Sequence, residues 1–201
     1  MSKKAGTSLV DQISAMDAKL QVDKVQSDEY RNQRYSVLAK FIAAQNKAEG
    51  KGKDGAVPRK AASASPQLTK AQAALREGVS LGLGSAAAQR ALQLFTACLD
   101  SEPSNADAWF GRGAALAAVE GVELCADEAK LCYAQCCRLD PRHASAQAEL
   151  GSLLWSEGFE EEAEAATKAA LKLDPKHPLA LLTQVSLALV PVVEVVAVKR
   201  E

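Results

Sequence analysis

Residues 139–143 read LDPRH, and residues 173–177, which lie 34 positions later, read LDPKH. Each copy has an alanine twelve residues before its proline, Ala129 in the first copy and Ala163 in the second. A weaker earlier copy places Ala91 twelve residues before Pro103. Region 91–175 is therefore an internal repeat, and a fixed period of this length is typical of stacked structural units that each contact only their neighbours.

Other small and aromatic residues recur at fixed positions within this repeat. Phe95 and Tyr133 each follow the alanine of their copy by four residues, and glycine recurs at Gly113 and Gly151. The pattern resembles the tetratricopeptide repeat, a helix–turn–helix unit of 34 residues. The resemblance covers about residues 70–190. Its signature positions are Ala91, Phe95, Pro103, Trp109, Gly113, Ala129, Tyr133, Pro141, Gly151, Ala163 and Pro175.

The resemblance implies an all-α, right-handed solenoid of about three helix pairs with a capping helix. Small residues are then required where two helices cross, because larger ones would separate the helix axes beyond about 8–10 Å. Phe95 and Tyr133 would fill the core between helices, and Thr167, which replaces the aromatic residue in the last repeat, predicts looser packing there. The three repeat prolines should each end a helix, since proline disfavours helical geometry in the preceding residue.

We expect the helices of the array at 68–83, 87–100, 105–119, 125–139, 144–156, 160–173 and 178–190. The second pair carries four extra residues in its turn, because Gly113 and Ala129 are 16 residues apart whereas Gly151 and Ala163 are 12 apart. Pro191 should stop the last helix. The β-branched stretch 192–198 is compatible with a strand, a helix or an apolar peptide that pairs elsewhere.

Four segments follow from composition. Residues 1–46 form a basic amphipathic helical arm, with one helix over about 8–46. Residues 47–66 are a flexible linker rich in glycine, alanine and serine. Residues 67–190 are the array with its capping helix, and residues 191–201 are an apolar tail. Residues 1–70 hold 13 Lys/Arg and 7 Asp/Glu, and residues 71–201 hold 11 and 18. This asymmetry predicts either mutual attraction between the basic N-terminal region and the acidic array, or a tail meant for an acidic partner.

The residue types argue against catalysis and against bound cofactors or metals. The two histidines, His143 and His177, occupy equivalent positions just before helices, which indicates a structural role at the boundaries between repeats. No phosphate loop, nucleophile elbow or zinc-protease motif occurs. Helical Cys132 and Cys136, with Cys125 or His143, are a weak pattern for zinc. The basic linker has no interleaved aromatic residues, so nucleic-acid binding is disfavoured.

Five cysteines without a Cys-x-x-Cys pair, and no signal peptide, predict a reducing, cytoplasmic compartment. The cysteines at 98 and 136 occupy positions where the resemblance implies a small residue. No segment approaches the roughly 20 apolar residues that span a bilayer.

The resemblance places the first helix of each pair on a concave face. The residues expected to line this groove are Asp107, Phe110, Ala114, Ala117, Ala148, Glu149, Ser152 and Trp155, with Gly111 and Ser145 beside them. Similar proteins grip acidic chaperone C-termini with Lys and Asn at positions that here hold Gly111, Ser145 and Glu149. That clamp is therefore absent. Phe110 and Trp155 either anchor a partner or pack between helices.

These residues predict an adaptor, scaffold or assembly chaperone that binds a helical or basic segment of another protein in the groove. The alternative is a structural subunit built permanently into a large cytoskeletal or ribonucleoprotein complex through its arm. A third expectation concerns regulation. The arm has an apolar stripe and the groove an apolar floor, so the arm could dock in the groove and compete with a partner.

Overall fold

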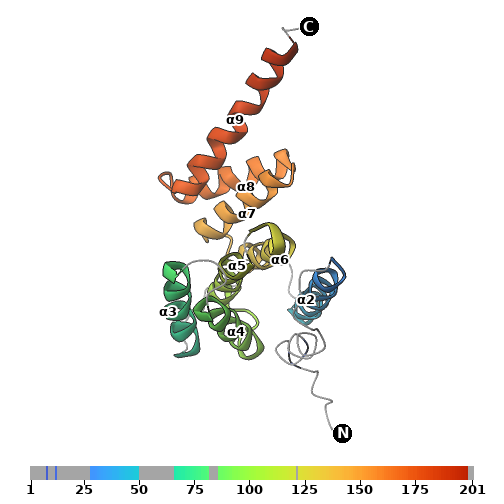
Figure 1. The fold of residues 1–201 in the computed structure, drawn as a ribbon, viewed down its shortest axis with the longest axis vertical. Helices are drawn as coiled ribbons and strands as arrows, with labels where there is room; N and C mark the ends of the chain where they lie inside the picture. The colour runs from blue at the N-terminus through green and yellow to red at the C-terminus, as the bar shows by residue number, and fades with distance from the viewer. Residues whose placement is uncertain are drawn as a thin grey trace.

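The computed structural model describes Ser8, Gln12 and residues 28–49, 66–81, 86–120 and 122–198, which are almost entirely helical (Figure 1). The helices are α2 (Asp28–Glu49), α3 (Pro66–Leu81), α4 (Ala86–Ser101), α5 (Ala106–Glu120), α6 (Val122–Leu139), α7 (Ala144–Ser156), α8 (Glu160–Leu173) and α9 (Pro178–Val198). The predicted all-α class is confirmed. Most of the predicted linker, and the arm before residue 28 apart from Ser8 and Gln12, lie outside the described residues.

Three pairs of helices build the array. Helix α3 packs on α4, α5 on α6 and α7 on α8, and each pair meets the next helix of the chain through the contacts α4–α5, α6–α7 and α8–α9. We call α3, α5 and α7 the first helices and α4, α6 and α8 the second helices. Helix α9 is an additional first helix that contacts both α7 and α8. The predicted solenoid of three helix pairs and a closing helix is confirmed.

The repeated small residues lie where the two helices of a pair cross. A Cβ atom on Gly113 would lie 2.7 Å from Cε1 of Tyr133, and one on Gly151 would lie 2.7 Å from Oγ1 of Thr167. Each glycine therefore lets a second-helix side chain touch the first-helix backbone. Thr167 is fully buried in this contact. The prediction of looser packing at Thr167 is therefore wrong, because the smaller side chain sits directly against the backbone of α7.

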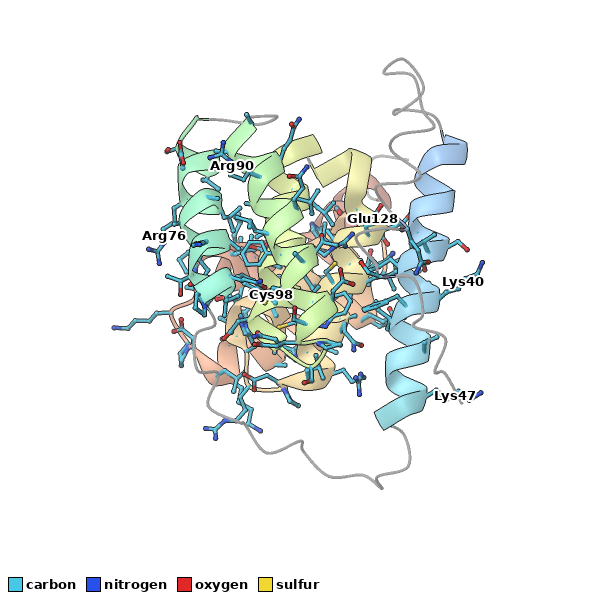
Figure 2. The ribbon with its side chains drawn as sticks, turned by 90° about the horizontal axis from the view of Figure 1, so that it is seen from below. Lys40, Lys47, Arg76, Arg90, Cys98 and Glu128 are labelled. Atoms are coloured by element: carbon cyan, nitrogen blue, oxygen red, sulfur yellow. The ribbon has the colours of Figure 1, made fainter. Side chains whose placement is uncertain are left out.

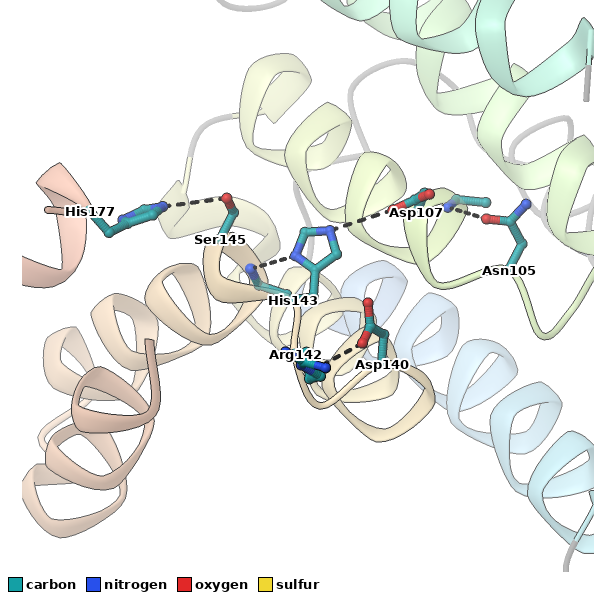
Figure 3. Close-up of polar contacts among 9 residues, drawn as sticks. Asn105, Asp107, Asp140, Arg142, His143, Ser145 and His177 are labelled. Atoms are coloured by element: carbon teal, nitrogen blue, oxygen red, sulfur yellow. Dashed lines mark hydrogen bonds and ion pairs between the residues drawn. The ribbon is translucent and has the colours of Figure 1, made fainter. Parts of the chain in front are cut away.

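The repeat prolines mark the ends of the second helices, as predicted. Helices α4, α6 and α8 end at Ser101, Leu139 and Leu173, each two residues before its proline. The next first helix begins with a side-chain cap (Figure 3). The side chain of Asn105 accepts a hydrogen bond from the Ala108 amide, and His143 Nδ1 accepts one from the Ala146 amide, both at 3.0 Å. Such caps satisfy amides that have no partner within the helix.

The last helix does not stop at Pro191. Helix α9 continues to Val198 and extends away from α7 and α8 (Figure 1). The predicted helix end at residue 190 is wrong. Proline has a φ compatible with a helix, and no glycine or asparagine follows it to form a C-cap, so the lost hydrogen bond alone does not end the helix.

Helix α2, the described part of the arm, packs along α6. Leu38 is fully buried, with Val37, Phe41 and Ile42 around it, and the Phe41 ring centroid lies 6.3 Å from that of Trp109. Lys40 and Lys47 are exposed and point away from the array (Figure 2). The apolar stripe of the arm thus covers the array itself, on a second helix. The expectation that the arm docks on the first-helix side is wrong for this segment.

We predict that Ala129→Leu destabilises the fold by about 1–3 kcal/mol, because a larger side chain overpacks a buried crossing. Ala129 is buried with Tyr133 and Leu153. The matched control is Ala134→Leu, at an exposed position of the same helix, which should change stability by less than about 0.5 kcal/mol. Urea denaturation measures both, and equal midpoints would contradict the assigned crossing.

Candidate partner-binding face

Most residues predicted for the groove share the accessible side of two first helices. Residues 107, 110, 114 and 117 recur every three or four positions along α5, and residues 149, 152 and 155 do so along α7, so each set forms one stripe. All are exposed or half-buried. We call this surface the first-helix face, formed by Asp107, Phe110, Ala114, Ala117, Glu149, Ser152 and Trp155.

Ala148 does not belong to this face. It is fully buried and packs with Ala170 of α8 and Ala180 of α9. The prediction for Ala148 is wrong because it counted positions along α7 alone, whereas the start of α9 packs against this side of α7.

The predicted place of Gly111 beside the groove is also wrong. A Cβ atom on it would lie 2.2 Å from Cζ of Phe95. It therefore faces α4 of the preceding pair, and its role is close packing.

Phe110 packs between helices. Its ring centroid lies 5.7 Å from that of Tyr133 on α6 and 4.7 Å from that of His143, at the start of α7. The ring is therefore held on two sides. Of the two predicted roles, packing between helices accounts for Phe110. Trp155 is half-buried near the end of α7.

The two histidines make equivalent contacts between successive first helices (Figure 3). His143 Nε2 lies 3.6 Å from Asp107 Oδ1, and His177 Nε2 lies 3.3 Å from Ser145 Oγ. Asp107 and Ser145 are each the second residue of their helix. The histidines therefore join neighbouring first helices, which agrees with their predicted structural role.

The first-helix face is acidic. Burial raises the pKa of the Glu149 carboxyl above its usual value, because ionisation is less favourable away from water. Burial raises the pKa of Tyr133, and the nearby negative charge of Glu149 raises it further. Asp107, the other acid of the face, is half-exposed and lies beside His143. A positive group placed against this face would offset part of the cost of ionising Glu149.

A buried ion pair behind this face was not predicted. Arg112 Nη2 lies 3.2 Å from Glu128 Oε2, and Arg112 Nη1 donates to Cys132 Sγ at 3.0 Å. Both charged side chains are almost completely buried. The sequence did contain a signal, since Arg112 and Glu128 directly precede the crossing residues Gly113 and Ala129 and share their 16-residue spacing.

The described side chains that could ligate a metal are those of cysteine, histidine and the acidic residues. No group of three or more His, Cys, Asp or Glu side chains is arranged to hold a metal within them. Cys98, Cys132 and Cys136 are buried, and burial raises the pKa of the Cys137 thiol to about 11. These cysteines thus act as small apolar residues. In the same part of the chain, no helix is both long and apolar enough to cross a membrane.

Comparison with known proteins identifies the repeat. The family model of the tetratricopeptide repeat matches residues 144–177, which comprise α7, α8 and the turn after them. Among solved structures, the Arabidopsis OM64 TPR domain is similar at 20% sequence identity and a TM-score of 0.48, covering 61% of this chain and 97% of that one. No curated protein matches the chain. The predicted tetratricopeptide repeat is thus matched at residues 144–177, the third helix pair with the turn that follows it.

We predict that Glu149→Gln raises the melting temperature at pH 7. The folded carboxyl has a raised pKa, so the folded protein binds a proton more tightly than the unfolded chain, and stability falls as pH rises through that pKa. The amide of glutamine does not ionise, so the variant avoids this loss of stability. Its higher melting temperature should approach that of the wild type below about pH 4, where Glu149 is neutral in both the folded and the unfolded wild type.

Glu161→Gln is the matched control. Glu161 is exposed in the first turn of α8, where a negative charge favours the helix. Its removal should leave the melting temperature unchanged or lower it. A Glu149→Gln variant that melts below the wild type at pH 7 would contradict the desolvated position of Glu149.

Proposed function

We propose that this chain is a protein–protein adaptor whose first-helix face binds a basic amphipathic helix of a partner. The observation that carries the proposal is Glu149, a half-buried and desolvated carboxylate on α7 that lies close enough to Tyr133 of α6 to affect its ionisation. Such a carboxylate costs folding free energy when ionised, and a cation that approaches it reduces that cost.

The surroundings of Glu149 suit a helix. Ser152 and Trp155 follow it at intervals of three residues along α7, and Ala114 and Ala117 lie on the neighbouring stripe of α5. Small side chains let a helix lie close, and a half-buried tryptophan is a frequent anchor of binding free energy. Asp107, at the start of α5, supplies a second acid for a second basic residue of the same helix.

Two other classes of interaction are less compatible with these residues. The chaperone clamp stays disfavoured, because an acidic C-terminus would meet the carboxylates of Glu149 and Asp107. The alternative of a structural subunit attached through its arm is weakened, since the apolar residues of α2 are already covered by α6 and α5. The described helix of the arm, α2, packs on α6, which is a second helix.

A designed peptide pair tests the proposal. We expect a fluorescent Leu/Lys amphipathic helix to bind the full chain, and a Leu/Glu peptide with the same apolar face not to bind. Glu149→Gln and Trp155→Ala should each weaken the Leu/Lys peptide about tenfold, which corresponds to roughly 1.4 kcal/mol. Fluorescence anisotropy gives the affinities.

Glu161→Gln controls for nonspecific attraction, because it removes the same charge from an exposed site on a second helix. If it weakens the peptide as much as Glu149→Gln does, binding follows net charge and the proposed face is wrong. Equal binding of the Leu/Glu peptide would also contradict the proposal.

A further inference from the structure

Helix α9 carries the largest exposed apolar stripe in the described part of the chain. Its members are Leu181, Leu182, Val185 and Leu189, with exposed fractions of 41%, 64%, 56% and 54%. Such a continuous stripe on one helix is typical of an interaction surface. We call it the α9 stripe.

The 34-residue period explains why this side of α9 is open. Residue for residue, α9 corresponds to α7, so that Val185 stands where α7 has Gly151 and α5 has Gly113. Those glycines are buried against second helices. Likewise Leu182 stands at the position of Ala148, which α8 and α9 bury. Helix α9 is thus the first helix of a fourth repeat, and its stripe includes two positions, Leu182 and Val185, whose equivalents in the complete third pair are buried.

Helix α9 itself does not turn back to provide that second helix. Helices α5 and α7 have 15 and 13 residues before their turns, whereas α9 continues for 21. The residue equivalent to Glu160, where α8 begins, is Glu194, and it lies inside α9. The described residues therefore leave the stripe to be covered from outside the array.

The spacing of the stripe points to a coiled-coil type of contact. Leu182, Val185 and Leu189 are separated by three and then four residues, and the sequence continues this spacing with valines at 192 and 196. A repeat of three and four is the seam of two helices that pack side by side. The valine at position 185 favours such side-by-side packing, because its side chain prevents the close helix crossing that glycine allows in the complete repeats.

The absence of charge on this part of α9 favours a second copy of the same helix as the occupant. No charged residue lies between His177 and Glu194, so the stripe lacks the flanking charges by which coiled coils select a different partner. Two identical uncharged stripes can meet around a two-fold axis without bringing like charges together. Helix α9 extends away from the rest of the array (Figure 1). An antiparallel pair centred near Leu189 would therefore keep the two arrays at opposite ends.

We propose that α9 pairs with α9 of a second copy of this chain, so that the protein is a dimer with two outward-facing arrays. The α9 stripe forms the contact. Partner binding on the first-helix face does not enter this proposal, and either could hold without the other.

Light scattering coupled to gel filtration tests the pairing on the full chain of 21.2 kDa. We expect the wild type to elute with about twice this mass and to dissociate on dilution. Val185→Glu should give the monomer, since it places two like charges in the apolar seam. Val79→Glu is the matched control, because Val79 is 65% exposed on α3, far from the stripe in sequence, and it should leave the dimer intact.

Circular dichroism shows whether each variant remains folded, and Leu182→Gln provides a milder second disruption should Val185→Glu unfold. A wild type that stays monomeric at every concentration would overturn the proposal. So would a dimer that persists in both stripe variants, or one that Val79→Glu also breaks. A monomer that floats with phosphatidylcholine vesicles would equally overturn it, by assigning the stripe to a lipid surface.

Discussion

The fold depends on one close contact. In a helix pair, a side chain of the second helix packs directly against the backbone of the first helix. At Gly113 the ring of Tyr133 occupies the place where a Cβ atom would be, and at Gly151 the hydroxyl of Thr167 does so. Because the contact recurs in the second and third pairs, it sets how closely the two helices of each of these pairs approach. The prolines then end the second helices in register, and Asn105 and His143 cap the helices that come after them. Stacking of neighbouring pairs extends the same geometry along the chain.

The same constraint divides the surface into sides with different chemistry. On the second helices, α6 is covered by α2, whose Leu38 and Phe41 complete the core around Trp109. On the first helices, Glu149 and Trp155 stay accessible beside small residues, which is the basis for the proposed binding of a basic helix. Where the contact is missing, at Val185, a third side is left uncovered and apolar. Whether a side of a first helix is covered therefore depends on whether a second helix packs against it.

Features that recur in the sequence could be predicted, and features that occur once could not. The third pair begins and ends where predicted, at 144–156 and 160–173, because glycine, alanine and proline all mark it. Ala148 was misassigned, since its burial depends on α9 rather than on its own helix. The continuation of α9 through Pro191 depends on which residues come after the proline. The arm was predicted to be amphipathic, but its place on α6 depends on tertiary packing that a helical stripe alone does not specify. The Arg112–Glu128 pair is likewise confined to one repeat.

Hydrogen–deuterium exchange of the full chain, with and without the Leu/Lys peptide, tests most directly whether the first helices are the binding side. We predict that the peptide slows exchange in α5 and α7 (residues 106–120 and 144–156), because a bound helix there suppresses local opening. Helices α6 and α8 should change less, although they belong to the same pairs. Slowing confined to α2, α6 or α8, or no slowing under conditions where the peptide is bound, would contradict this assignment.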